Sequence, residues 1–285
     1  MRRIIKEKML ERYEIHLKNE EKSKATINKY LCDLRKLIEF MAGREVSKEL
    51  MLAYKDKLLT QDSYKVSSVN SFLVAANCFF EFMGWLDLKV KTYNIQRETF
   101  CTEDKFLSKD EYFCLVKTAK ELGKIRLSMI IQTICATGIR VSELRAVTVP
   151  AVQKGSVVIH NKGKIRTVLL PDKLRKELLY YISRMGIKKG IVFCTASGKV
   201  VNRSNIWREM KALCKTAGVD ENKVFPHNLR HLFATVFYGI KKDIAKLADV
   251  LGHSNIETTR IYIKTTGREH KKQLNQMKLV TGCQF

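Results

Sequence analysis

Residues 226–231 read Pro-His-Asn-Leu-Arg-His, and they are followed by Leu-Gly-His at residues 251–253 and, after eight more residues, by Tyr262. Upstream, residues 137–144 read Thr-Gly-Ile-Arg-Val-Ser-Glu-Leu. A tyrosine hydroxyl can attack phosphorus, guanidinium groups can hold the charge that builds on phosphate oxygens, and imidazoles can assist with protons. These residues in this order are what the cleavage of a phosphodiester without a metal ion requires. The candidates for catalysis are Arg140, His227, Arg230, His253 and Tyr262.

The net charge of the chain also indicates a partner that carries phosphate groups. The 285-residue chain carries a formal charge of +24 with a pI near 9.7, and most of the excess lies after residue 100. Such a field favours a polyanion, either nucleic acid or an anionic membrane surface. No apolar run is long enough for a membrane span, and the eight cysteines include no CxxC pair. We therefore expect a cytoplasmic protein with reduced thiols, no zinc site and no membrane association.

The four motif segments resemble the tyrosine recombinases of the phage-integrase family. The resemblance is close over residues 107–264 and loose over residues 8–85, where residues 23–34 look like the opening of the family's core-binding domain. It implies a mainly α fold with a small antiparallel sheet, in which a helical core-binding domain and a mixed α/β catalytic domain clamp double-stranded DNA. It implies a site-specific recombinase that works through a covalent 3′-phosphotyrosine and a Holliday junction. Such enzymes act as homotetramers on two DNA sites and need no metal, ATP or other cofactor.

The resemblance also assigns roles to the candidates. Tyr262 would be the nucleophile, and Arg140 and Arg230 would be the paired arginines that clamp the phosphate. A planar guanidinium binds two oxygens at once and keeps its charge, which a lysine cannot match. His227 and His253 would handle protons or donate to phosphate. Many relatives carry tryptophan at the second position, so His253 would be a supporting group.

A basic turn supplies a sixth candidate. Residues 156–160 and 165–170 are β-branched runs around a turn that contains Lys162, which predicts a hairpin. The family keeps a catalytic lysine on such a hairpin, where it protonates the departing 5′ oxygen, and Lys162 aligns best. Lys164 and Arg166 are competitors for this role.

Helical periodicity organises the rest of the first part of the chain. Apolar residues recur at helical spacing in residues 27–41 and 69–83, each run followed by a glycine, and shorter amphipathic segments lie around residues 3–18 and 47–60. These four segments predict a helical bundle.

In the second part of the chain, Ser108 followed by acidic residues predicts the start of a helix. Further helices are expected at residues 126–136, after Pro171 and at residues 203–217. The expected organisation is a core-binding domain, a linker, a catalytic domain and a tail for subunit contact, at residues 1–90, 91–105, 106–266 and 267–285.

Two local signals place candidate residues. Thr137 and Gly138 interrupt an apolar segment, so Arg140 is expected at the start of the next helix. Residues 254–257 read as a capping box, which places Tyr262 about two turns into a short helix.

Three readings of the function compete. Type IB topoisomerases use a similar residue set to nick and reseal one duplex, and a non-catalytic relative would only occupy DNA sites. The short helical N-terminal part and the pattern of residues 227–231 favour a recombinase, and the intact candidates oppose a decayed relative. Within the pattern, Glu143 is expected to orient the arginine motif, and His231 is expected to be structural.

Overall fold

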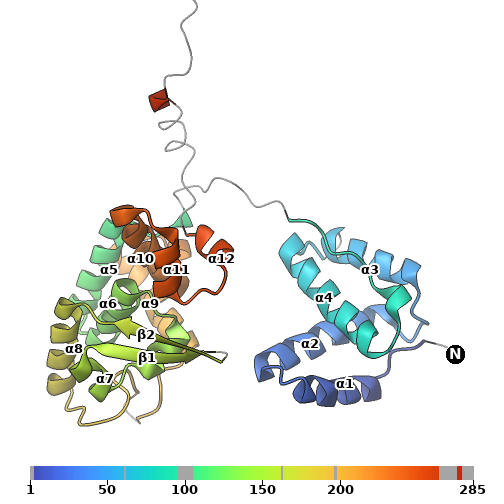
Figure 1. The fold of residues 1–285 in the computed structure, drawn as a ribbon, viewed down its shortest axis with the longest axis horizontal. Helices are drawn as coiled ribbons and strands as arrows, with labels where there is room; N and C mark the ends of the chain where they lie inside the picture. The colour runs from blue at the N-terminus through green and yellow to red at the C-terminus, as the bar shows by residue number, and fades with distance from the viewer. Residues whose placement is uncertain are drawn as a thin grey trace, which may run out of the picture. The chain divides into compact units, whose positions relative to one another are not determined.

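The protein is mainly helical. The computed structural model describes residues 3–60, 62–95, 105–161, 163–195, 198–262 and 275–277. These residues form one two-stranded antiparallel sheet, and the chain divides into two compact units, Met1–Arg97 and Glu98–Phe285 (Figure 1). The expected fold class is confirmed. No helix in the described ranges is long and apolar enough to cross a membrane.

The first unit is a four-helix bundle. Its elements are α1 (Glu7–Asn19), α2 (Lys24–Met41), α3 (Lys48–Thr60) and α4 (Val66–Phe82), followed by the short 3-10 helix η1 (Leu86–Leu88). Their apolar faces enclose one core, in which Tyr13 packs edge-on against Phe79 at a centroid distance of 5.3 Å. The four helical segments expected from periodicity are confirmed.

The first helix begins later than the sequence pattern suggests. Residues before Glu7 are extended because the Arg3 backbone N–H donates to Glu45 and the Arg3 guanidinium pairs with Asp87. Ile5 is buried in the core without being helical. Apolar residues before a helix can thus mimic its periodicity.

The bundle holds the chain beyond its last helix. The Asn77 amide exchanges hydrogen bonds with the backbone of Val90, and the Asn70 amide does the same with Tyr93. Packing of the first unit therefore extends past residue 90. Residues 96–104 of the expected linker (residues 91–105) lie outside the described ranges.

The second unit wraps helices around one large core, with a smaller apolar cluster that includes Tyr262, and carries the hairpin at one side (Figure 1). Its elements are α5 (Lys109–Glu121), α6 (Ile125–Thr137), η3 (Val141–Ala146), α7 (Val149–Lys154), β1 (Ser156–Asn161), β2 (Lys164–Leu169), α8 (Asp172–Arg184), α9 (Arg203–Ala217), η4 (Glu221–Lys223), α10 (Pro226–Lys241), α11 (Ile244–Leu251) and α12 (Ile256–Arg260). The side chain of Ser108 caps α5 in a full capping box with Glu111, as expected.

The register of the hairpin determines which side chains face the site. Val157 pairs with Val168, and both are buried against the core. Two residues along each strand, Ile159 pairs with Arg166, so Arg166 lies on the same inward face. The turn residue Lys162 is outside the described ranges, as is the expected tail apart from residues 275–277.

Candidate active site

Candidates from four separate segments come together at one end of the second unit. Arg140 immediately precedes η3, His227 and Arg230 lie in the first turns of α10, His253 follows α11, and Tyr262 follows α12. Of the six predicted site residues, only Lys162 cannot be placed, because it is not among the residues described.

A glycine sets the position of Arg140. Gly138 ends α6 in the left-handed region, with φ of +65°. A Cβ atom there would lie 2.5 Å from the Phe233 ring, so only glycine fits without displacing that ring. The chain then turns so that Arg140 caps the start of η3, which is a 3-10 helix rather than an α-helix.

The carboxylate of Glu143 organises the arginines around it. It is buried and accepts hydrogen bonds from the Arg140 backbone N–H at 2.7 Å, from Arg140 Nη1 at 3.1 Å and from Arg166 Nη2 at 2.8 Å. The orienting role expected for Glu143 therefore has a geometric basis. Arg166, a competitor for the lysine role, is instead held between Glu143 and the carbonyl of Leu251, to which its Nη1 donates at 2.7 Å.

Arg230 is almost completely buried, with 2% of its surface exposed. Its guanidinium donates to the carbonyls of Gly138 and Leu251 and to Nε2 of His253, the last at 2.9 Å. Burial, and then the positive charge of Arg140, lowers the Arg230 pKa to about 10. The group therefore remains cationic at neutral pH, and its position is fixed before any phosphate arrives.

Both matched histidines are neutral at pH 7. Burial, followed by the charge of Arg230, lowers the pKa of His253 to about 4. The same two causes, with Arg140 third, lower the pKa of His227. Neutral imidazoles can accept a proton, but they are poor proton donors at this pH.

Tyr262 is surrounded by three imidazole rings. Its ring centroid lies 5.6 Å from that of His227, 5.5 Å from that of His231 and 5.8 Å from that of His253. Only 3% of its surface is exposed, because Leu251 and other apolar residues cover the rest. Tyr262 is therefore enclosed by protein in this conformation.

The expected placement of Tyr262 within a helix is wrong. Helix α12 is a single turn that ends at Arg260, and Tyr262 lies in the following turn, where its N–H donates to the Thr259 carbonyl. The cap is also shifted by one residue, because the Asn255 side chain accepts from the Glu257 N–H. Asn and Ser are both good caps, so the sequence could not choose between Ser254 and Asn255.

His231 has the structural environment expected for it. Its ring stacks on Phe106 at a centroid distance of 3.8 Å, and its Nδ1 lies 3.3 Å from Thr235 Oγ1. Burial, and then the neighbouring His227, lowers the His231 pKa to about 4. Sequence reasoning missed Phe106, since a stack between residues 125 positions apart leaves no local pattern.

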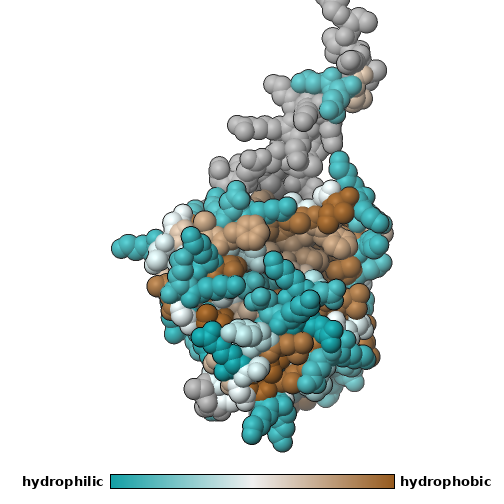
Figure 2. Space-filling view, turned by 90° about the vertical axis from the view of Figure 1, so that its left-hand side faces the viewer, coloured by the Kyte–Doolittle hydropathy of each residue, from teal (hydrophilic) through white to brown (hydrophobic). Residues whose placement is uncertain are grey.

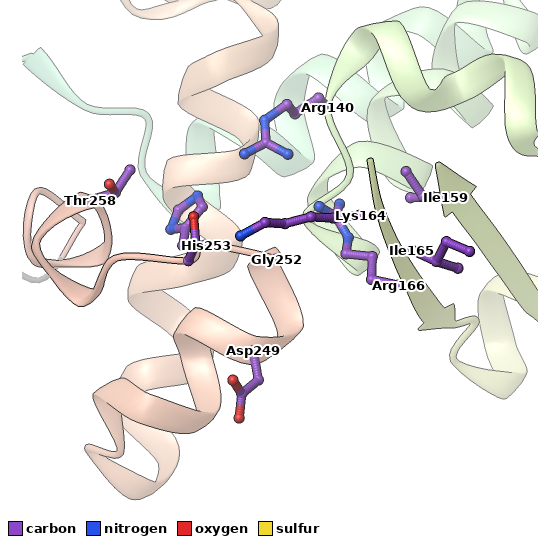
Figure 3. Close-up of a pocket in the computed structure, with 10 residues that line it drawn as sticks. Arg140, Ile159, Lys164, Ile165, Arg166, Asp249, Gly252, His253 and Thr258 are labelled. Atoms are coloured by element: carbon purple, nitrogen blue, oxygen red, sulfur yellow. The ribbon is translucent and has the colours of Figure 1, made fainter. Parts of the chain in front are cut away.

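A cavity of about 650 Å³ opens beside these residues (Figure 3). Its walls include Arg140, Arg166, Gly252 and His253, and the side chain of Lys164 extends from β2 into it toward His253. The lining carries the positive charges of Arg140, Lys164 and Arg166 against the one carboxylate of Asp249, so the cavity suits a phosphate of a polyanion. Among the described residues, no group of three histidine, cysteine or carboxylate side chains is arranged to hold a metal ion.

Comparison with known proteins agrees with this geometry. Residues 105–269 match the model of the phage integrase family, and residues 10–85 match its N-terminal SAM-like domain. The tyrosine recombinase XerA of Pyrococcus furiosus is 29% identical over 283 residues, which cover 97% of this chain and 96% of that protein.

Two solved structures share the fold. The XerH site-specific recombinase bound to difH substrate in a pre-cleavage complex has a TM-score of 0.68 and 20% identity, covering 87% of this chain and 78% of that one. A lambda integrase tetramer bound to a Holliday junction has a TM-score of 0.72 and 15% identity, covering 90% and 76%. The chain therefore belongs to the phage integrase family, and it is a tyrosine-type site-specific recombinase that acts on DNA.

Proposed function

We propose that this recombinase cuts DNA by attack of the Tyr262 hydroxyl on a backbone phosphate. The observation that carries the proposal is the gathering of Tyr262 with His227, Arg230 and His253 beside a cavity that Arg140 lines. A bond forms between the tyrosine oxygen and phosphorus, and the 5′ oxygen of the next nucleotide leaves with a proton. The DNA 3′ phosphate is then held as a phosphotyrosine. Because one phosphodiester replaces another, rejoining requires no ATP.

Arg140 and Arg230 would hold the two non-bridging oxygens of that phosphate. Charge accumulates on these oxygens as the fifth ligand approaches phosphorus, and fixed cations stabilise it most when they need no rearrangement. Arg230 meets this condition through its two carbonyl contacts, and Arg140 through its two contacts with Glu143.

The histidines would divide the remaining work. His227 is neutral and lies beside the Tyr262 ring, so it is suited to accept the phenolic proton. His253 contacts Arg230 directly, so its proposed role is to support that arginine.

A lysine of the hairpin would protonate the departing 5′ oxygen. We assign this role to Lys162, and Lys164 is the alternative because its side chain lines the cavity. Lys162→Ala should slow cleavage by on the order of a hundredfold or more, as for other losses of general-acid catalysis. A substrate with a bridging 5′ phosphorothiolate does not need that proton and should restore much of the rate. If the phosphorothiolate substrate restores cleavage by Lys164→Ala and not by Lys162→Ala, Lys164 is the residue that protonates the 5′ oxygen.

The central experiment replaces the nucleophile. Tyr262→Phe removes one hydroxyl, so it should bind DNA with near-unchanged affinity, because phosphate contacts supply most of the affinity. It should form no covalent adduct with a nicked suicide duplex whose recombination site has been selected from a random-sequence library. Protein-linked DNA from the mutant on a denaturing gel would show that another residue attacks.

We further propose that four copies act on two double-stranded DNA sites and exchange strands through a Holliday junction in the cytoplasm. The net charge of +24 supports a DNA partner, and the lambda integrase relative forms a tetramer on such a junction. A two-site recombination assay tests this directly, because a topoisomerase would relax DNA without exchanging strands.

The tail would join the copies. Its sequence places four apolar residues among basic ones: Leu274, Met277, Leu279 and Val280. An apolar groove of about 510 Å³ between α5, α6 and α10 includes the exposed side chains of Phe113 and Ile240, and Figure 2 shows hydrophobic side chains gathered in the upper half of one face of this unit. We propose that residues 268–285 of a neighbouring copy occupy this groove in a head-to-tail contact.

Deleting residues 268–285 should leave single-site binding intact and abolish the tetramer on two-site DNA, as measured by light scattering. Tetramers formed by the truncated protein would rule out this docking.

A further inference from the structure

Thr259 is a fully buried polar residue inside the site, with none of its surface exposed. Its hydroxyl oxygen lies 2.9 Å from Nδ1 of His253. A residue so deeply covered cannot contact DNA in this conformation. Any contribution it makes to the reaction must therefore pass through the groups that it touches.

The hydrogen bonds around His253 determine which nitrogen carries its proton. An arginine side chain has only donors, so the 2.9 Å contact from Arg230 requires Nε2 to be the acceptor. Nε2 therefore has no hydrogen, and a neutral imidazole must carry its proton on Nδ1. That N–H points at Thr259 Oγ1, which accepts it.

Thr259 also contacts the nucleophile segment through its backbone. Its carbonyl accepts the Tyr262 N–H at 3.0 Å. A continuous chain of contacts thus runs from Arg230 through His253 and Thr259 to Tyr262. Thr259 thus adds a hydrogen-bonded link between Arg230 and Tyr262, beside the direct stacking of the His253 and Tyr262 rings.

We propose that Thr259 is a positioning residue, whose hydroxyl accepts the Nδ1–H of His253, stabilises the tautomer that Arg230 requires, and thereby holds Arg230 toward the phosphate. The proposal rests on the function argued above for the same site. In the other tautomer, an Nε2–H would face the donors of Arg230, and the two groups would separate. A hydrogen bond to one ring nitrogen of a histidine commonly fixes its tautomer and ring orientation, and so the contact that the other nitrogen makes.

Two substitutions isolate the hydroxyl. Thr259→Val keeps the shape but removes the acceptor, so the buried Nδ1–H loses its partner. Thr259→Ser keeps the acceptor and should behave like the wild type. Thr133→Val is the matched control, because Thr133 is equally buried but its hydroxyl bonds only to the Met129 carbonyl of its own helix.

The first measurement needs no DNA. In the full-length protein with ¹⁵N-labelled histidine at pH 7, the ¹⁵N resonances of His253, assigned by their loss in His253→Ala, report which nitrogen is protonated. We expect a protonated Nδ1 in the wild type, in Thr259→Ser and in Thr133→Val. Thr259→Val should show a protonated Nε2 or a mixture. A wild-type His253 with its proton on Nε2, or an unchanged tautomer in Thr259→Val, would overturn the proposal.

The second measurement is the single-turnover rate of covalent adduct formation on the nicked suicide duplex. Loss of the acceptor for a buried donor should slow Thr259→Val by about ten- to a hundredfold, with DNA affinity unchanged. Thr259→Ser and Thr133→Val should remain within about threefold of the wild type. A Thr259→Ser rate as low as that of Thr259→Val would show that packing, not the hydroxyl, matters.

The two measurements separate this inference from the proposed function. If the wild type forms no adduct through Tyr262, the proposed function fails, whatever the tautomer of His253. If the adduct forms but the tautomer does not follow the Thr259 hydroxyl, only the positioning role fails. Should Thr259→Val not fold, Thr259→Ala removes the same acceptor, and its His253 tautomer and adduct rate decide the question in the same way.

Discussion

Replacing Glu143 by glutamine tests whether one buried carboxylate holds the arginines of the site together. The substitution preserves size and shape but removes the negative charge. It also places an NH₂ group where one of the two oxygens now accepts hydrogen bonds. Three donor contacts, two from Arg140 and one from Arg166, depend on those oxygens.

The expected loss of stability follows from the burial of the partners. Removing one member of a buried ion pair costs on the order of 3–5 kcal/mol. The side chain of Arg166 is 14% exposed and that of Arg140 is 35% exposed, so the lower end of this range, about 3 kcal/mol, is appropriate. For a unit of about 150–250 residues, each kcal/mol lowers Tm by roughly 2–4 °C. The melting temperature should therefore fall by about 6–12 °C.

Thermal unfolding of the full chain measures this effect, with Glu209→Gln as the control. Glu209 pairs with Arg126 in the same unit, but both side chains are about a third exposed, and such pairs contribute roughly 0–1 kcal/mol. Cleavage by Glu143→Gln should also slow by about tenfold or more, since Arg140 loses the negative charge and one of the two oxygens that hold it, and 1.4 kcal/mol corresponds to about tenfold. Equal Tm values for the two variants would refute the role of Glu143 as the central anion.

Two further predictions concern the glycine and the histidine behind the site. Gly252→Ala should lower Tm by more than Gly218→Ala in a thermal scan. Both glycines have φ between +60° and +70°, but only at Gly252 would a Cβ lie 2.6 Å from the Arg166 side chain. Equal losses of Tm in the two variants would show that Arg166 moves aside freely. His231 has a pKa of about 4 in the folded protein, against an ordinary value of 6.5. Between pH 4 and pH 6.5 the unfolded chain therefore binds more protons at this residue than the folded one. The stability that the neutral His231 contributes is complete above pH 6.5 and is lost as the pH falls toward 4. Phe106→Ala uncovers the imidazole and should raise its pKa, which an NMR titration measures, and an unchanged pKa would contradict burial by the Phe106 ring as the cause.

The helices with a clear apolar period were predictable from sequence. In residues 24–41 a serine cap, a continuous apolar stripe and a following turn all agree, and α2 spans Lys24–Met41. The hairpin was predictable for the same reason, since two β-branched runs flank a basic turn with glycine. Where local propensity and burial point the same way, a single sequence is enough.

The long-range contacts that hold the side chains of the site in place were not predictable from the sequence. Arg166 was a competitor for a catalytic role, but its partners are the Glu143 carboxylate, 23 residues away, and the Leu251 carbonyl, 85 residues away. Sequence patterns report periodicity over one or two turns, and they carry no information about which backbone carbonyl a long side chain will reach. The role of Thr259 was hidden for the same reason, since it depends on which imidazole nitrogen faces which partner.

The Leu251 carbonyl shows how these distant contacts combine. It ends α11 and accepts from both Arg166 and Arg230, so one backbone atom joins the hairpin to Arg230. Glycine follows at position 252 because the left-handed turn and the crowding by Arg166 leave no space for a side chain. A shift of the hairpin on binding DNA would therefore pull on the same carbonyl that positions Arg230. The hairpin that carries the proposed leaving-group lysine and Arg230, the proposed phosphate-binding arginine, are thus linked through one backbone atom, which would allow both parts of the site to be completed together.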